Sequence, residues 1–225
     1  MKKLILSALA LALTTTFAFA QVNQNARSFP NRADAVTGDQ ARNSAIEGFM
    51  AEFAPQEAGI LHVYASAPND PAETYLFRGQ EASGTTLAML PVKFQQKAKQ
   101  MGAKVYATKA IKLMGVDDHY LVRMDGTYED RIEMFKVEGN TVKHVKTLAT
   151  DKCYDGMCDQ TDTWITDIDG DTDSELIQIS RTMRAGETTS EKQTVYTHTK
   201  NGKWKKSRKL AKDAPWTTIE FHGKK

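Results

Sequence analysis

The sequence predicts a β-dominated α+β fold, built from antiparallel hairpins and carrying two helices in its N-terminal third. Apolar residues recur at helical spacing before residue 104, and the pattern then changes. The later part contains short runs rich in β-branched and aromatic residues, separated by Gly, Asn and Asp. Gly139-Asn140 and Asn201-Gly202 lie at the centres of two such regions. Both dipeptides are typical of two-residue hairpin turns with positive φ, so we expect antiparallel pairs there.

The two expected helices are defined by their ends and by one apolar face each. The first begins at Asp39, which can serve as an N-cap, and ends at Pro55. The second begins near Pro91 and stops at Gly102. Their apolar faces comprise Ile46, Phe49, Met50 and Phe53 in the first helix, and Leu90, Phe94, Ala98 and Met101 in the second. Between them, residues 60–66 and 74–79 are predicted to form strands.

We expect a secreted or periplasmic protein with a single domain after its leader. Residues 1–20 have the charged start, the apolar run and the Ala18-Phe19-Ala20 ending of a cleavable signal peptide. Residues 21–38 are polar and are predicted to be a flexible N-terminal segment. Residues 39–225 then form one β-rich domain, with a helix-containing part (39–103) and a hairpin part (104–225).

The charge balance argues against nucleic acid or a membrane as the partner. The chain has 30 Lys and Arg residues and 28 Asp and Glu residues, and two of its lysines lie in the predicted signal peptide. The rest is therefore balanced at 28 and 28, which does not favour polyanion binding by the protein as a whole. No later stretch is long and apolar enough to insert in a membrane.

Two segments of equal length suggest an internal duplication. Residues 133–148 and 195–210 carry their turn dipeptides at the same central position, 62 residues apart. A duplicated four-stranded unit would resemble a β-propeller blade, although two blades do not close a ring. Any two hairpins would share this pattern, so duplication and coincidence both stay open.

The two cysteines predict a short local disulfide. Cys153 and Cys158 flank an Asp155-Gly156 turn, and both the even count and an oxidising compartment favour a bridge. A metal-binding pair and a redox-active pair are the alternatives. The bridge would be structural and would hold the segment that leads into the acidic loop described next.

The stretch DIDGDTDSEL (167–176) predicts a calcium site at a hairpin tip. It places five carboxylates in nine positions between two strand-like runs, and Gly170 permits a sharp bend. The predicted side-chain ligands are Asp167, Asp169, Asp171 and Glu175, and Asp173 would contribute its backbone carbonyl. Hard oxygen donors at this spacing suit Ca²⁺ better than Mg²⁺, which retains more of its water. The alternative is a solvated acidic turn without metal.

The loop resembles the calcium hairpin of FG-GAP or VCBS-type repeats, which occur in integrin-α propellers and in secreted bacterial proteins. The resemblance lies in Asp167, Asp169, Gly170, Asp171, Glu175 and Leu176, within about residues 163–180. Thr172 replaces the Gly that is common in that family, and Glu175 replaces the usual Asp. An EF-hand fits less well because its bidentate Glu is replaced by Gln178 and its flanking helices by strands. The resemblance implies a structural Ca²⁺ that stiffens the hairpin.

The function expected from the sequence is that of a non-enzymatic binding protein stabilised by Ca²⁺, with a glycan or a surface protein as partner. The basic segment 192–212, which includes Trp204, offers a surface for an anionic glycan, or else protects a sheet edge. The alternatives are a hydrolase acting on cell-surface polymers and a purely structural subunit. A candidate general base, His119, follows Asp117 and Asp118. A hydrolase would need a cleft with two converging titratable groups.

Overall fold

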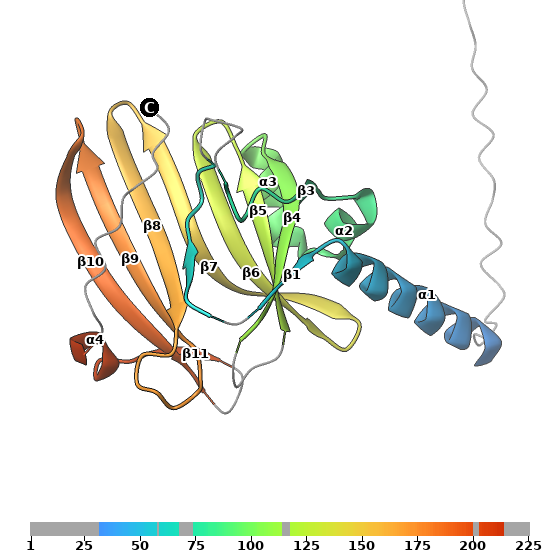
Figure 1. Cartoon of the computed structure of the whole chain (residues 1–225). Helices are drawn as coiled ribbons and strands as arrows, with labels where there is room; N and C mark the ends of the chain where they lie inside the picture. Colours follow the sequence, from blue (N-terminus) through green and yellow to red (C-terminus); the bar gives the residue numbers. More distant parts are fainter. Residues whose placement is uncertain (1–31, 58, 68–73, 114–117, 200–202, 214–225) are drawn as a thin grey trace, which may run out of the picture.

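The computed structural model describes residues 32–57, 59–67, 74–113, 118–199 and 203–213, and of residues 32–39 the backbone alone (Figure 1). The helices are α1 (Arg32–Ala51), α2 (Gly84–Met89), α3 (Val92–Gln100) and α4 (Leu210–Asp213). The strands are β1 (Ala54–Gln56), β2 (Leu61–Val63), β3 (Gln80–Glu81), β4 (Lys104–Lys112), β5 (Asp118–Asp125), β6 (Glu129–Glu138), β7 (Thr141–Tyr154), β8 (Met157–Thr166), β9 (Glu175–Arg184), β10 (Glu187–His198) and β11 (Trp204–Lys206). The predicted signal peptide and the turn at Asn201-Gly202 lie outside these residues.

The strands confirm a β-dominated fold. Strands β4 to β11 follow one another in sequence order as an antiparallel meander, and β1 adds a parallel strand beside β4. The predicted turn at Gly139-Asn140 joins β6 to β7, because Glu138 pairs with Thr141 across it. The meander belongs to one continuous 11-stranded sheet, so the two hairpin segments are not separate four-stranded blades.

The sheet divides between β7 and β8, and β2 lies in the gap. Strands β7 and β8 pair at their turn-proximal ends, from Thr150↔Thr161 to Tyr154↔Met157. Farther along β8 the partner is β2, which pairs through Leu61↔Ile165 and Val63↔Thr163. Figure 1 shows this segment running between the two halves of the sheet. Residues 62–66 are thereby brought next to the facing sides of β6, β7 and β8.

Both faces of the central strands are covered. Helices α1, α2 and α3 pack on one face through Phe49, Leu90 and Phe94, against residues such as Tyr120 and Phe135. The opposite face holds a second apolar cluster that includes Val63, Phe77, Leu121, Met134 and Ile165. Strand β5 is buried along most of its length because it contributes to both clusters. Such two-sided burial fixes the register of the neighbouring strands.

The helical part differs from the prediction at three places. Helix α1 begins at Arg32 instead of Asp39, and its residues 40–44 are exposed. Helix α2 was not predicted; its N-cap Ser83 accepts a hydrogen bond from the Thr86 backbone N–H at 3.2 Å. The short helix α4 was also missed. Both missed helices are too short to produce a full period of apolar residues, so sequence periodicity cannot detect them.

The predicted strand at 74–79 is wrong, because this segment is a turn. Its alternating apolar residues are buried, but side chains take the place of a partner strand. The Arg123 guanidinium donates to the carbonyls of Phe77 and Arg78 at 3.1 and 3.2 Å. The Tyr75 hydroxyl donates to the carbonyls of Tyr64 and Ala65 at 2.9 and 2.8 Å. The predicted strand at 60–66 shortens to β2 for a related reason: its last residues bond to side chains.

Candidate metal site

The acidic loop connects β8 to β9, as predicted, and the pair Thr166↔Glu175 closes its base. Its backbone curls around Asp167, whose two carboxylate oxygens accept from the N–H groups of Gly170 at 2.8 Å and Thr172 at 3.1 Å. Gly170 and Thr172 both have positive φ, at 76° and 73°. Thr172 therefore occupies a conformation that favours glycine.

Three of the predicted ligands come together at the centre of the loop. Asp167, Asp169 and Glu175 each offer a carboxylate oxygen, and these oxygens all lie within 4.8 Å of one another. Glu175 is 2% exposed, whereas Asp169 lies at the surface. Three converging carboxylates, one of them buried, are a donor set that can hold a metal ion.

Asp171 and Asp173 lie outside this triad. Both are exposed, and Asp171 Oδ1 accepts the backbone N–H of Asp173 at 2.9 Å. Their predicted roles, a carboxylate ligand and a carbonyl ligand, remain predictions. A cation at the triad would draw on them or on water to complete its shell, since Ca²⁺ takes six to eight oxygens.

The electrostatics of the loop are unfavourable to its own negative charge. Burial, together with the nearby charges of Asp169, Asp171 and Asp167, raises the pKa of Glu175 to about 7. The Ile168 backbone N–H, which donates to Glu175 Oε2 at 2.9 Å, opposes this shift. The loop thus concentrates like charges around a buried carboxylate, an arrangement that a bound cation would neutralise.

The predicted disulfide is present at the far end of β8. Cys153 and Cys158 pair directly across the β7–β8 hairpin and are bonded to each other. The turn between them has positive φ at both Asp155 (50°) and Gly156 (73°), as a two-residue hairpin of this type requires. The bridge pins one end of β8, and the acidic loop follows its other end.

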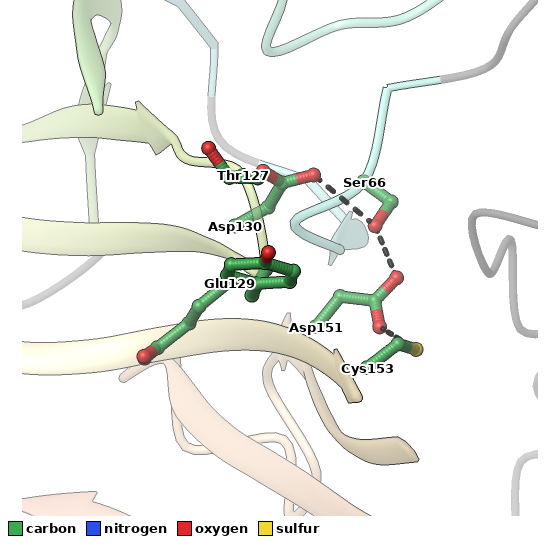
Figure 2. A pocket seen from close by; sticks show the side chains of 7 residues that line it. Ser66, Thr127, Glu129, Asp130, Asp151 and Cys153 are labelled. Atoms are coloured by element: carbon green, nitrogen blue, oxygen red, sulfur yellow. Dashed lines mark hydrogen bonds between the residues drawn. The ribbon is translucent and has the colours of Figure 1, made fainter. Parts of the chain in front are cut away.

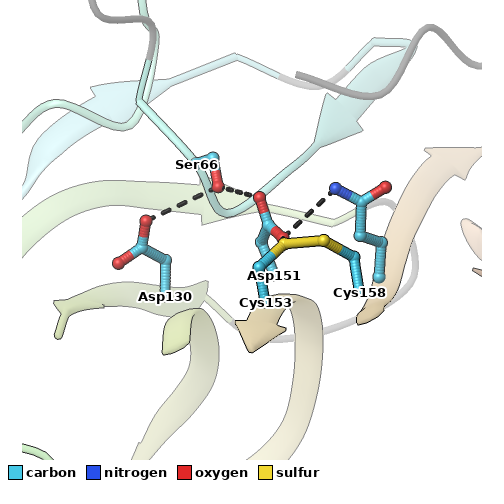
Figure 3. The surroundings of a disulfide bond; sticks show 6 residues. Ser66, Asp130, Asp151, Cys153 and Cys158 are labelled. Carbon is cyan, nitrogen blue, oxygen red and sulfur yellow. Dashed lines mark hydrogen bonds between the residues drawn. A yellow bond between two sulfur atoms is a disulfide. The ribbon is translucent and has the colours of Figure 1, made fainter. Parts of the chain in front are cut away.

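A buried polar cluster, which sequence reasoning missed, lies where the segment after β2 enters the divided sheet. Ser66 Oγ lies within hydrogen-bonding distance of Asp151, and 3.5 Å from Asp130 Oδ2 (Figure 2). Gln160 Nε2 donates to Asp151 Oδ1 at 3.1 Å. Asp151 lies beside the Cys153–Cys158 disulfide (Figure 3). We call Ser66, Asp130, Asp151 and Gln160 the Ser66 cluster. Asp130 and Asp151 lie 64 and 85 residues from Ser66 in the sequence, so no local motif predicts the cluster.

Asp162 extends the polar environment on the β8 side of this cluster. Its Oδ2 lies 2.9 Å from His62 Nε2, and the His62 ring stacks on Trp164 with centroids 4.3 Å apart. The candidate general base named from the sequence, His119, is instead 1% exposed within β5. Its burial removes it from any surface that a polymer could reach.

No protein-family model matches the chain, and neither does any curated protein or solved structure in the comparisons. Among the residues that the structure describes, no helix is both long and apolar enough to cross a membrane.

Proposed function

We propose that this protein is a secreted or periplasmic, non-enzymatic binding protein whose acidic hairpin loop carries one structural Ca²⁺. The observation that supports this most is the convergence of Asp167, Asp169 and Glu175 on one point between two paired strands. All donors are hard oxygens, and the loop tightens around them through the hydrogen bonds to Asp167. Hard, flexible oxygen sites of this kind favour Ca²⁺ over softer or smaller ions.

A structural role for the ion follows from its place in the fold. The loop joins two neighbouring strands of the continuous sheet, so a cation there would hold the β8–β9 connection in one conformation. The resemblance to FG-GAP and VCBS hairpins supports the same role, and the disulfide suits the extracytoplasmic setting that the predicted signal peptide implies.

The ligand surface that fits a binding role is a basic groove between β6, β7 and β11. It has a volume of about 520 Å³ and is lined by Lys136, Glu138, Lys143, His144, Val145, Lys146, Lys203 and Trp204. Its acid, Glu138, already pairs with Lys136 and Lys143. Burial and the charge of Lys206 lower the pKa of Lys146. A groove with excess positive charge beside an indole suits an anionic glycan.

The hydrolase alternative finds less support. Asp130 and Asp151 do converge on Ser66, beside a cavity of about 200 Å³. Their exposed fractions are only 2% and 8%, however. A carboxylate that exchanges protons with a polymeric substrate must reach it directly, so this burial favours a role within the protein.

Thermal unfolding tests the calcium proposal. The protein is unfolded in excess EDTA and then with Ca²⁺ or Mg²⁺ titrated in. Native-state binding should stabilise it by about 2.7 kcal/mol at a hundred times the dissociation constant. The stabilisation should be selective for Ca²⁺ and absent from Asp169→Ala. If millimolar Ca²⁺ leaves the melting temperature unchanged, the loop is a solvated acidic turn.

The glycan proposal needs a separate binding measurement. A sulfated hexasaccharide should bind with an affinity that falls as salt is added, and a neutral hexasaccharide of equal length should bind much more weakly. Lys143→Ala and Lys146→Ala should weaken the sulfated ligand. Lys152→Ala, an exposed lysine elsewhere on β7, is the matched control. Equal weakening by all three variants would mean non-specific attraction.

A further inference from the structure

Two carboxylates and a single hydroxyl meet in the Ser66 cluster. The Ser66 hydroxyl carries one proton but faces the carboxylates of both Asp130 and Asp151. Asp130 also accepts the Gly126 N–H at 3.2 Å. The hydrogen-bond partners of Asp151 among the described residues are Ser66 and Gln160, and the disulfide-bonded Cys153 Sγ lies 3.3 Å from its Oδ1; all three are uncharged. A buried carboxylate with neutral partners is costly unless a positive charge lies nearby.

A second, independent feature is the buried amide of Gln160. Its Nε2 is used by Asp151, but its Oε1 has no hydrogen-bond partner among the described residues, although the side chain is only 4% exposed. Buried carbonyl oxygens are nearly always satisfied, so an orphan of this kind calls for an explanation. An amide oxygen beside a carboxylate is also a good ligand for a hard cation.

These groups border one small void. It has a volume of about 10 Å³ and is lined by Tyr64, Ala65, Ser66, Thr150, Asp151, Gln160 and Asp162. That is about the space of a single water molecule or a single ion. A water could donate to Gln160 Oε1, but it would leave the negative charge of Asp151 uncompensated. A cation would coordinate Gln160 Oε1 and also compensate the charge of Asp151.

We propose that this void is a second cation site, which binds a divalent metal ion through Asp151, the Gln160 amide oxygen and neighbouring oxygens of Ser66 and Asp162. The ion would hold the segment after β2 against β7 and β8, at the point where the sheet divides. The site is separate from the acidic loop in its residues and does not depend on the loop being a calcium site.

Counting bound ions in matched variants tests the second site. Equilibrium dialysis with Ca²⁺ should give two ions per chain for the unchanged protein. Asp151→Asn, which is nearly isosteric, should retain only the loop ion, and Asp169→Asn should retain only the cluster ion. The double variant should bind none. Gln160→Met, which removes the amide oxygen at similar volume, should weaken the cluster ion at least tenfold, and it serves as the test if Asp151→Asn does not fold.

The outcomes separate the two sites. One ion that disappears in Asp169→Asn but persists in both Asp151→Asn and Gln160→Met overturns the second site and leaves the loop proposal intact. One ion that persists in Asp169→Asn but is lost in Asp151→Asn and weakened in Gln160→Met establishes the cluster site and rejects the loop site. No bound ion in the unchanged protein overturns both, and the void then holds water.

Discussion

Two glutamates buried to nearly the same extent occupy opposite electrostatic environments. Glu133 on β6 is 3% exposed and Glu175 at the start of β9 is 2% exposed. Glu133 is contacted by Arg131 Nε at 2.7 Å, by Thr147 Oγ1 at 2.7 Å and by His144 Nε2 at 2.8 Å. Glu175 has the Ile168 N–H and is surrounded by aspartates.

The pKa values follow this contrast. Burial alone would raise the pKa of Glu133, but the hydrogen bond with His144, the charge of Arg131 and the Thr147 hydroxyl together hold it below its ordinary value. Burial and the charges of the neighbouring aspartates together raise the pKa of Glu175 to about 7. One carboxylate is therefore compensated from within the protein, whereas the other lies among like charges that a bound cation would neutralise.

The largest expected difference comes from replacing each glutamate with glutamine. Glu133→Gln removes one of the two carboxylates that pair with Arg131 and leaves Glu129 as the other. We expect a loss of about 2–3 kcal/mol, since breaking a buried ion pair costs roughly 3–5 kcal/mol, Glu129 still pairs with Arg131, and His144 is partly exposed. Glu175→Gln in EDTA relieves repulsion and should cost nothing or stabilise slightly. Urea unfolding at pH 7 measures both.

Calcium should make Glu175→Gln less stable than the unchanged protein, and it should leave the stability difference of Glu133→Gln as it was. With Ca²⁺ present, the unchanged protein gains stability and Glu175→Gln does not, while Glu133→Gln gains as much as the unchanged protein. Equal losses for the two variants in EDTA would contradict the comparison, because they would show that Glu175 is also compensated by the protein.

A smaller effect, of opposite sign at the two residues, is expected on the pH dependence of stability. The pKa of Glu133 is lowered on folding, so its stabilisation is present above the ordinary value near 4.5 and is lost as pH falls below it. The pKa of Glu175 is raised in the metal-free protein, so its contribution is present below 4.5 and is lost as pH rises towards 7.

Unfolding free energies from pH 4 to 8 in EDTA resolve the two trends. The unfolding free energy of the unchanged protein minus that of Glu175→Gln should decrease as pH rises from 4.5 to 7. The corresponding difference for Glu133→Gln should decrease as pH falls below 4.5. Saturating Ca²⁺ should remove the first trend, because the ion replaces the proton. A Glu175 trend that persists in Ca²⁺ would argue against its role as a ligand.

The same two residues show what the sequence can and cannot predict. Glu175 was assigned to a site because its neighbours lie within eight residues along the chain, and the strands on either side were evident from their alternating pattern. The compensation of Glu133 comes from His144 and Thr147 across a hairpin, 11 and 14 residues away. This compensation depends on the pairing register of β6 and β7, which includes two register shifts that the sequence pattern does not predict.

The Ser66 cluster marks the limit of such reasoning. Ser66 follows a strand of only three residues, and its partners Asp130 and Asp151 lie on two other strands. Their meeting requires β2 to enter the divided sheet, which follows from tertiary packing and not from any local preference. The turn at 74–79 was mispredicted for the same reason, since Arg123 from a distant strand holds its carbonyls.

The smallest expected effect concerns the strained backbone of the loop that holds Glu175. Thr172 has a φ of 73°, which costs a non-glycine residue roughly 1–2 kcal/mol, while glycine loses roughly 0.5–1 kcal/mol more backbone entropy on folding. Thr172→Gly should therefore stabilise the protein by about 0.5 kcal/mol. Ala185→Gly, at a φ of 49° in the β9–β10 turn, should do the same.

Calcium affinity separates these two glycine variants. Both relieve backbone strain, but only Thr172 lies in the loop, where its N–H donates to Asp167 at 3.1 Å. Relieving the strain at that position should let the loop hold the Asp167 carboxylate in its binding orientation at a lower free-energy cost. The dissociation constant for Ca²⁺ should therefore fall about twofold, as a calorimetric titration would show. Ala185→Gly should leave the affinity unchanged. Weaker binding in Thr172→Gly would mean that the threonine rigidifies the loop, and that the strain there is part of how the site is held ready for the ion.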